Sequence, residues 1–499
     1  MNSLMTTLQQ RAASTPEDTV LEGLNTPVSA HELYERIKLT ANYLRESNAK
    51  TIALFADNNI DWIVVDLACQ FAEITLVPLA TFFSVSQVEH VLTSAAVELL
   101  LYDAAQQHKL LNHGEKIGLE ITGVDNFLAR NIKSLKKTTM PLGTNKITFT
   151  SGSTGQPKGV CLSTQQCLRV AQSLVEIIPC FKPKHLCLLP LSTLLENIGG
   201  IYMPLLAGGT ITVVPSSTLG LTGSSSLDSN RLIKAIEKYQ PNTMILVPQL
   251  LAALDHALSL GWKPPSSLKF VAVGGARVSP TTLARAHKSG LPVYEGYGLS
   301  ESASVVALNN PANNRPGSSG KPLGHVDVKI KNGEVFVSGN SFLGYLNQID
   351  SWGRSSVATG DMGAIDSDGY LTITGRIKNQ IITSYGRNIN PEWIETELLA
   401  HQQIQQAIVV GDARPSCMAL IYPRDQGMSD QQIQQTINLT NQQLPDYAQI
   451  AYWLRMDAPL SPQNHLLTEN GRPRRDLIES RYVEKINQCY KPLMESVLL

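Results

Sequence analysis

The sequence lacks the features that mark several special classes of protein. Its 7 cysteines are scattered, with no CxxC pair and no even framework in a short secreted chain, so buried thiols in a reducing cytosol are expected. Its formal net charge of only −1 gives no global field that would gather nucleic acid, whose recognition depends on neutralising phosphates. We therefore expect no nucleic-acid partner, and any anion must be bound by a local site.

No apolar run is long enough to cross a bilayer. The longest apolar region, WIVVDLACQFAEITLVPLATFF, is broken by Asp66, Gln70, Glu73 and Pro78, whereas a spanning helix needs about 20 apolar residues. The N-terminus also lacks the basic region, apolar run and small-residue cleavage site of a secretory signal. A cytoplasmic protein is expected, for which peripheral contact with a membrane stays open.

What the chain does contain is the pattern of a folded α/β protein of more than one domain. Its 499 residues exceed what one core supports, and 43% hydrophobic with 17% charged residues is an ordinary globular composition. Short β-branched runs such as TIALFA, KITFT and TMILVP recur between amphipathic stretches such as SAHELYERIKLTANYLRES. This alternation predicts α/β layers with largely parallel sheets.

The local sequence pattern of the chain changes toward the C-terminus. After about residue 320, tight turns and short strands predict a β-rich subdomain, and from about residue 377 a further α/β unit is expected. That unit should hold a strand at AIVVG and helices near 391–400 and 430–443. The Ser/Gly-rich tract STLGLTGSSSLDSN predicts an exposed loop before a helix near Asn230. The expected domains are residues 1–376 and 377–499.

The most informative stretch is KITFTSGSTGQPKGV, residues 146–160, in which a strand runs into a loop rich in Gly, Ser and Thr. Glycines let backbone N–H groups turn toward an anion, hydroxyls add donors and a lysine adds a point charge. The Walker spacing GxxxxGK[ST] is absent, and a flexible linker is the alternative interpretation. The residues of the predicted polyphosphate cradle are Thr150, Ser151, Gly152, Ser153, Thr154, Gly155 and Lys158.

Two later stretches, KFVAVGGARVSP and VYEGYGLSES, each predict a strand ending in a turn, which is where open α/β sheets bind ligands. A tyrosine can stack on a base, a serine can donate to a phosphate oxygen and a glutamate can hold Mg²⁺. A third stretch, VATGD through GRIKNQI, adds a carboxylate for ribose hydroxyls and a guanidinium for ribose or phosphate. These candidates are Gly274, Gly275, Ala276, Tyr297, Gly298, Ser300, Glu301, Asp361 and Arg376.

In this order, TSGSTGQPKG, GGA, YEGYGLSE, TGD, GRIKNQI and SYGRNINPEWIE resemble the motifs of the adenylate-forming (AMP-binding) superfamily of acyl-CoA synthetases, adenylation domains and luciferases. The resemblance covers nearly the whole chain. It implies an α/β fold with a large N-terminal domain of parallel-rich sheets, a β-rich subdomain and a small mobile α/β C-terminal domain. It also implies a chemistry in which a carboxylate attacks the α-phosphate of ATP and a thiol, commonly that of coenzyme A, then takes the acyl group.

The resemblance implies a role for each candidate. Residues 150–158 would hold the outgoing phosphates, Gly275 and Tyr297 the adenine, Ser300 the α-phosphate, Glu301 with Thr150 the Mg²⁺, and Asp361 with Arg376 the ribose. Lys378 would be the hinge of the C-terminal domain, and Gly386 would leave room for the coenzyme A arm. The catalytic set would comprise Lys158, Ser300, Glu301 and Arg472.

Arg472 departs from the family pattern. In the segment LTENGRPRR it stands where the family has a lysine that reaches the acid and the α-phosphate, with Arg475 matching a trailing arginine. A guanidinium is a wider planar fork than an ammonium, so the change is not conservative at a crowded centre. We expect a slow or unusually specific adenylation step, in which Arg474 or Arg475 can share the role.

The acid is predicted from LCLLPLSTLLENIGG, which resembles the LPLSH-x-x-E stretch of long-chain fatty acyl-CoA ligases, with Thr193 in place of the frequent histidine. A medium- or long-chain fatty acid is therefore expected, although a leucine-rich stretch is equally typical of core. The alternatives are a ligase that loads a carrier-protein thiol, another acyl-adenylating ligase, and a degenerate member that binds nucleotide or acyl chain without turnover.

Overall fold

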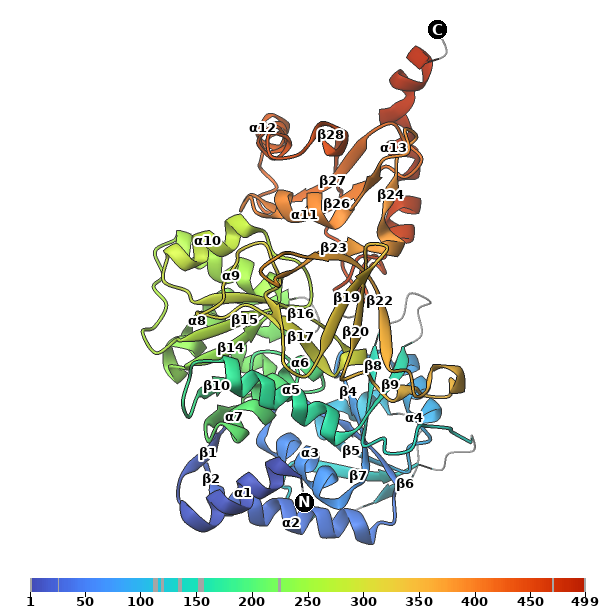
Figure 1. The fold of residues 1–499 in the computed structure, drawn as a ribbon. Helices are drawn as coiled ribbons and strands as arrows, with labels where there is room; N and C mark the ends of the chain where they lie inside the picture. The colour runs from blue at the N-terminus through green and yellow to red at the C-terminus, as the bar shows by residue number, and fades with distance from the viewer. Residues whose placement is uncertain are drawn as a thin grey trace.

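The described chain forms a large N-terminal lobe and a smaller C-terminal lobe, the latter drawn orange to red (Figure 1). The computed structural model describes residues 2–25, 27–110, 115–117, 121–132, 137–150, 157–222, 226–468 and 471–497. This mixed α/β architecture is the one that the sequence predicts. No helix within these ranges is long and apolar enough to cross a membrane.

The first large sheet carries the phosphate-loop candidates. Its strand order is β21-β9-β8-β4-β3-β5-β7-β6, with parallel pairing from β8 through β4 and β3 to β5 and antiparallel pairing toward both edges. The strands are β3 (Thr51–Phe55), β4 (Thr75–Leu79), β5 (Leu99–Asp103), β6 (Glu115–Ile117), β7 (Phe127–Asn131), β8 (Lys146–Thr150), β9 (Lys158–Leu162) and β21 (Gly344–Tyr345). The neighbouring helices are α2 (Ala30–Glu46), α3 (Ile60–Ala72) and α4 (Val85–Ser94).

The second large sheet carries the nucleotide-loop candidates. Its order is β18-β17-β16-β15-β14-β10-β11-β1-β2, and it is parallel from β1 to β16. The strands are β1 (Thr19–Glu22), β2 (Val28–Ser29), β10 (Lys184–Leu186), β11 (Thr210–Thr212), β14 (Thr243–Leu246), β15 (Phe270–Val273), β16 (Val293–Leu299), β17 (Ser304–Leu308) and β18 (Lys321–Pro322). The helices are α1 (Ser3–Ser14), α5 (Thr164–Ile177), α8 (Ser229–Tyr239), α9 (Pro248–Ser259) and α10 (Pro280–Lys288).

The Ser/Gly-rich tract is more structured than the sequence predicts. Residues Ser216–Leu219 form a 3-10 helix, and β12 (Leu221–Thr222) pairs with β13 (Ser226–Leu227). The expectation of a plain loop is therefore wrong. The following helix begins within one residue of the predicted position, because Asp228 accepts hydrogen bonds from the backbone N–H groups that open α8.

The β-rich subdomain and the C-terminal lobe follow in sequence order, as predicted. The subdomain is an antiparallel sheet of β19 (Asp327–Lys331), β20 (Glu334–Ser338), β22 (Ser356–Ile365) and β23 (Leu371–Arg376). The C-terminal lobe contains β24 (Ile381–Ile382), β25 (Asn388–Ile389), α11 (Pro391–Leu399), β26 (Ile404–Val410), β27 (Cys417–Pro423), α12 (Asp430–Asn441), β28 (Ile450–Arg455) and α13 (Arg475–Val497). Asn390 caps α11, and proline follows at the first helical position.

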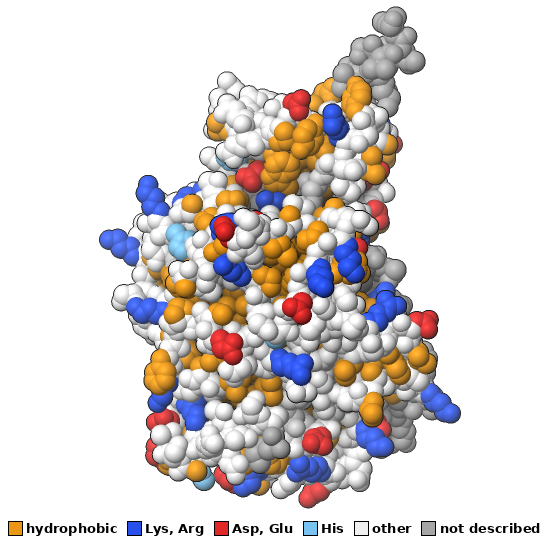
Figure 2. All heavy atoms as spheres, viewed as in Figure 1, with side chains coloured by type: hydrophobic (Ala, Val, Ile, Leu, Met, Phe, Trp, Pro, Cys, Tyr) orange, Lys and Arg blue, Asp and Glu red, His pale blue; other side chains and the backbone are white. Residues whose placement is uncertain are grey.

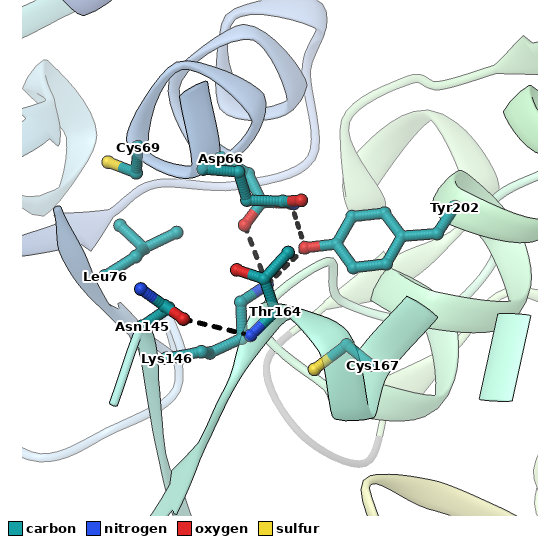
Figure 3. A pocket seen from close by; sticks show the side chains of 9 residues that line it. Asp66, Cys69, Leu76, Asn145, Lys146, Thr164, Cys167 and Tyr202 are labelled. Carbon is teal, nitrogen blue, oxygen red and sulfur yellow. Dashed lines mark hydrogen bonds and ion pairs between the residues drawn. The ribbon is translucent and has the colours of Figure 1, made fainter. Parts of the chain in front are cut away.

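A buried polar cluster supports the strand that leads to the phosphate loop. Lys146 of β8 forms an ion pair with Asp66 of α3, with 2.7 Å between Nζ and Oδ1. Asn197 and Tyr202, which begin and end a π-helix, both accept hydrogen bonds from the same ammonium group. The Tyr202 hydroxyl donates to Asp66 at 2.6 Å (Figure 3). All four side chains are buried, so β8, α3 and the π-helix are fixed to one another by groups that cannot separate without leaving a charge unpaired.

Replacing Lys146 by Met should lower the free energy of unfolding by about 3–5 kcal/mol, because the substitution leaves the Asp66 carboxylate buried without its cation. Denaturant unfolding of the parent and the variant measures the change. Lys485→Met is the matched control, since Lys485 pairs with Asp457 at 2.9 Å where both side chains are about half exposed or more, and it should cost less than about 1 kcal/mol. Equal losses in the two variants would contradict the assigned importance of the buried cluster.

Candidate active site

The two ends of the predicted phosphate cradle lie opposite each other. β8 and β9 form an antiparallel hairpin in which Thr150 is the register partner of Lys158. Lys158 is exposed, and its Nζ lies 5.6 Å from the centroid of the Tyr345 ring. The hairpin therefore presents a hydroxyl and an ammonium at the mouth of the loop. The other five cradle candidates lie outside the described residues: Ser151, Gly152, Ser153, Thr154 and Gly155.

Ser300 and Glu301 lie in a short 3-10 turn, Ser300–Ser302, that follows β16 directly. The backbone oxygen of Glu301 accepts a hydrogen bond from the N–H of Phe342 at 2.7 Å, and its carboxylate Oε1 accepts one from the Tyr345 hydroxyl at 2.7 Å. Burial, together with the Glu301 carboxylate, raises the pKa of Tyr345, so the phenol stays protonated as the donor. Tyr345 thus touches both Lys158 and Glu301.

Sequence reasoning missed Tyr345. The dipeptide Gly344-Tyr345 forms the short strand β21, which pairs with β9 from a distant part of the chain. The only local signal is an aromatic residue beside a glycine in SFLGYLN, and such a pattern is common in turns. The partner of the tyrosine was therefore not visible before the fold was known.

The adenine-loop candidates follow β15. Gly275 has φ +88°, a conformation that favours glycine, and Gly275 and Ala276 are exposed whereas Gly274 is buried. Beneath this loop, Glu295 of β16 accepts a hydrogen bond from the N–H of Val278 at 3.3 Å and is 5% exposed. Burial raises the pKa of Glu295 to about 7. The loop therefore rests on a carboxyl group that titrates near neutral pH.

Tyr297 and Gly298 lie inside β16, so the expectation that Tyr297 stands at a strand end is wrong. β16 is parallel to β15 as far as Glu295 and then continues as one arm of an antiparallel hairpin with β17. A side chain on Gly298 would place its Cβ 1.8 Å from the backbone oxygen of Ser304, so only glycine fits there. Tyr297 is consequently held on a hairpin whose two strands approach closely.

The ribose candidates are brought together by strand register. Asp361 of β22 and Arg376 of β23 are register partners, and Arg376 Nε lies 2.7 Å from Asp361 Oδ1. The Tyr297 hydroxyl donates to Asp361 Oδ2 at 2.7 Å. Asp361 is 4% exposed, and burial raises the pKa of its carboxyl while Arg376 and Tyr297 oppose that rise. Three candidates from separate motifs thus form one constellation.

Arg472 approaches this constellation from the C-terminal lobe. Its loop is closed by two hydrogen bonds, in which Arg472 N–H donates to Thr468 Oγ1 at 3.0 Å and Thr468 N–H donates to the Arg472 oxygen at 2.8 Å. Crowding by protein lowers the pKa of Arg472, the like charge of Arg376 lowers it further, and Asp361 and Glu301 oppose this. The side chain is exposed, and its charge acts on Asp361, Glu301 and Arg376 from the C-terminal lobe.

The neighbouring arginine has a different role. Arg475 forms an ion pair with Glu395 of α11, with Nη2 at 2.6 Å from Oε2 and 2.8 Å from Oε1. Its Nη1 also donates to the oxygen of Val409 at 3.2 Å. These contacts lie within the C-terminal lobe, so Arg475 holds that lobe together.

The segment between the lobes is short and exposed. Lys378 lies in the single 3-10 turn Ile377–Asn379 that follows β23. Gly386 has φ +72° in the turn between β24 and β25, and no atom lies within 4 Å of the position that a Cβ would occupy. The contacts across the junction include polar ones, for example Gln402 Nε2 donating to Asp255 Oδ2 at 3.0 Å.

The segment expected to bind the acid is partly buried in the core and partly beside the nucleotide loop. Thr193 is exposed and donates a hydrogen bond to the oxygen of Pro190, whereas Leu194 and Ile198 are buried in the main core. Leu195 is half-buried, and its Cδ2 lies 3.9 Å from the Cβ position of Gly274. Most of the leucine-rich continuation is therefore core, and Leu195 is the part of it beside the nucleotide loop.

One cluster of possible metal ligands includes two residues of this segment. His185, Cys187 and Glu196 are fully buried, with ligand atoms within 4.8 Å of one another. His185 bonds to Thr243 Oγ1 and to Glu196 Oε1, both at 2.9 Å, and Glu196 Oε2 accepts from the N–H of Leu189 at 3.0 Å. These hydrogen bonds occupy both nitrogens of His185 and both carboxylate oxygens of Glu196, so the cluster serves to fix the segment to its neighbouring strands.

Two of the described site residues, Glu301 and Thr150, offer oxygen donors suited to Mg²⁺. Glu301 is half-buried and offers carboxylate oxygens, and Thr150 offers a hydroxyl at the end of β8. Hard oxygen donors of this kind, together with phosphate oxygens, are what Mg²⁺ prefers. The donor chemistry therefore fits the metal that accompanies ATP.

Two family models match the chain: AMP-binding enzyme over residues 8–346, and AMP-binding enzyme C-terminal domain over residues 378–493. The first spans more than half of the chain. The chain belongs to the AMP-binding enzyme family. This AMP-binding enzyme is an ATP-dependent acyl-activating ligase of the acid–thiol class that works with ATP, Mg²⁺ and coenzyme A, as the motifs predicted.

Individual proteins agree with this assignment. A 2-succinylbenzoate–CoA ligase of Staphylococcus epidermidis is 29% identical over 422 residues, which cover 81% of this chain and 84% of the relative. A feruloyl-CoA synthase of Amycolatopsis is 27% identical over 448 residues, covering 81% and 85%. The crystal structure of an anthranilate CoA ligase in complex with anthranoyl-AMP superposes with a TM-score of 0.80 at 17% identity, covering 96% of this chain and 99% of that one. The last likeness confirms the fold of this AMP-binding enzyme.

Replacing Glu295 by Gln should remove a pH dependence of stability. Because the folded pKa is raised from 4.5 to about 7, the native state keeps a proton that the unfolded chain has lost, and stability falls as the pH rises through this range. Unfolding at pH 8 should therefore cost about 3 kcal/mol more in the variant than in the parent, with little difference at pH 4.5.

Denaturant titrations at both pH values measure the effect, and Glu484→Gln on the exposed face of α13 is the control. Parallel stability curves for the parent and the Glu295 variant would contradict the assignment of a titrating carboxyl beneath the adenine loop.

Proposed function

We propose that this AMP-binding enzyme converts an aromatic carboxylic acid into an acyl-adenylate and then into a coenzyme A thioester. The observation that carries the proposal is the constellation of Tyr297, Asp361 and Arg376, on which the charge of Arg472 acts from the C-terminal lobe. The relatives support the acid class, since the two named above are ligases for 2-succinylbenzoate and for ferulate.

The roles assigned to the residues are those that the motifs imply, and the positions of the described residues support them. Thr150 and Lys158 contact the outgoing phosphates at the open end of the β8–β9 hairpin, and Ser300 donates to the α-phosphate. Glu301 with Thr150 would hold Mg²⁺, which would neutralise phosphate charge. Phosphoryl displacement needs positioning and charge stabilisation more than covalent help, so fixed donors of this kind are sufficient.

The nucleoside lies against the second sheet in this proposal. Tyr297 stacks on the adenine from its hairpin, beside the backbone of Gly274, Gly275 and Ala276, and Asp361 accepts from the ribose hydroxyls. Arg472, which stands at the position of the family's lysine, bridges the acid and the α-phosphate.

The proposal assigns the C-terminal lobe a movement that begins near residue 377. The turn containing Lys378 is exposed, and interfaces with polar contacts between lobes permit relative motion. Movement of Arg472 away from Asp361 and Glu301 would then make room for a thiol. We assign the coenzyme A arm to the turn of Gly386, where no side chain obstructs it.

The long-chain fatty acid expected from the leucine-rich segment becomes the second candidate. That expectation depended on Leu194 and its apolar neighbours lining the acid site, and Leu194 and Ile198 are buried in the core. Leu195 and Val247 lie 3.9 and 3.8 Å from the Cβ positions of Gly274 and Gly275, so they are the apolar side chains beside the nucleotide loop.

Arg472→Ala should slow the adenylation half-reaction by about a hundredfold, because loss or misplacement of one group at the reacting centre has that effect. Arg472→Lys should be no slower than the parent, since an ammonium keeps the charge in a more compact form. Acid-dependent pyrophosphate release measures both. Arg481→Ala, on the exposed surface of α13, is the control. An Arg472→Ala variant as fast as the parent would contradict the active-site role and indicate that Arg472 is only a solvated surface residue.

A panel of acids tests the substrate class. Thioester formation with coenzyme A and ATP should show a kcat/KM at least about tenfold higher for 2-succinylbenzoate, ferulate or anthranilate than for octanoate or palmitate, since one or two apolar contacts discriminate by roughly 10–200-fold. The highest value on octanoate or palmitate would favour the second candidate. Activity confined to acetate or an α-amino acid would contradict both candidates. A carrier-protein thiol in place of coenzyme A tests the other acceptor.

A further inference from the structure

The segment around Tyr345 forms a brace between two parts of the active site that are far apart in sequence. On one side it pairs with β9, where Leu343 N–H donates to the Cys161 oxygen at 3.0 Å and Leu346 N–H donates to the Gly159 oxygen at 2.8 Å. On the other side Phe342 N–H donates to the Glu301 oxygen at 2.7 Å. The strand of Lys158 and the turn of Glu301 are thus attached to the same short segment.

Tyr345 itself is fixed from several directions. Its backbone N–H donates to Ser351 Oγ at 2.8 Å, and its oxygen accepts from Trp352 Nε1 at 2.8 Å. The Phe342 ring lies edge-on to its ring, with centroids 4.8 Å apart and an interplanar angle of 70°. A side chain held in this way has one available orientation, which is the condition for setting the positions of other groups.

The two functional ends of Tyr345 meet opposite charges. The ring face lies 5.6 Å from Lys158 Nζ, within the range of a cation–π interaction. The hydroxyl donates to Glu301 Oε1 at 2.7 Å, the length of a charge-assisted hydrogen bond. The tyrosine therefore has separate contacts with the lysine and with the glutamate, one through its ring and one through its hydroxyl.

We propose that Tyr345 is a positioning residue that keeps the Lys158 ammonium and the Glu301 carboxylate apart, the first toward the phosphates of ATP and the second toward Mg²⁺. The inference rests on the proposed function, which assigns those ligands to Lys158 and Glu301. The ring orients the cation, and the hydroxyl occupies one carboxylate oxygen so that the other faces the metal.

The two parts of the tyrosine can be removed separately. Tyr345→Phe keeps the ring and removes the hydroxyl, so the Mg²⁺ concentration for half-maximal binding of ATP should rise about tenfold, while ATP affinity at saturating Mg²⁺ changes less than about twofold. Tyr345→Leu removes both parts, so ATP affinity at saturating Mg²⁺ should also fall, by about 3–30-fold. Calorimetric binding of ATP at a series of Mg²⁺ concentrations, without any acid, measures both quantities.

Tyr370 provides the matched control. Its ring lies 4.2 Å from the Arg315 guanidinium and 4.9 Å from Lys321 Nζ, in the turn that follows β22. Tyr370→Phe and Tyr370→Leu should leave the Mg²⁺ dependence and the ATP affinity unchanged. Thermal unfolding of all four variants shows whether each is folded at the temperature of the binding experiment.

The outcomes separate this inference from the proposed function. A Tyr345→Phe variant with the parent's Mg²⁺ dependence would overturn the positioning role, and so would equal losses of both quantities in the Phe and Leu variants. A parent that binds ATP with Mg²⁺ but adenylates none of the acids would overturn the proposed function. The effect of the Tyr345 variants on ATP and Mg²⁺ binding could still be measured in that case. Should the Leu variant fail to fold, the Phe variant alone still decides the hydroxyl's part.

Discussion

The buried carboxylate of Asp361 is the group that joins the predicted nucleotide motifs to the last strand of the N-terminal lobe. A charge that is 4% exposed is costly without partners, and Asp361 receives them from Tyr297 and Arg376. Arg376 is the last residue of β23, and the turn into the C-terminal lobe follows at once. The carboxylate therefore fixes the end of the N-terminal lobe at the point from which the other lobe departs, and Arg472 adds a second positive charge from that lobe.

The phosphate hairpin is supported from two sides by polar groups of different kinds. Lys146 anchors β8 to α3 and the π-helix within the core, and Tyr345 anchors β9 to the turn of Glu301 at the surface. The face of the molecule in Figure 2 shows acidic and basic side chains interspersed, without a patch of one sign. We therefore expect an anion to bind at a few fixed groups and at the strands that hold them, in agreement with the net charge of −1.

Much of the fold could be predicted, because the signals were local. The strands at Thr51–Phe55 and Lys146–Thr150 and the helix at Pro391–Leu399 follow from β-branched runs and a capping residue that act within a few positions. The Ser/Gly tract at 217–230 was mispredicted because a two-residue strand pair is stabilised by what it packs against, which composition does not show. Tyr297 was placed at a strand end because the parallel part of β16 is indistinguishable in sequence from its antiparallel continuation.

The sequence by itself determined the family, the activity class and the order of the nucleotide motifs, because each motif encodes backbone conformation and donor type within a short stretch. Only the tertiary structure decided which of these groups meet. Asp361 and Arg376 are joined by strand register, Arg472 enters from the other lobe, and Tyr345 reaches Lys158 and Glu301 through a strand pairing between residues almost 200 positions apart. Such contacts depend on the relative placement of whole elements, which is set by packing across the entire core.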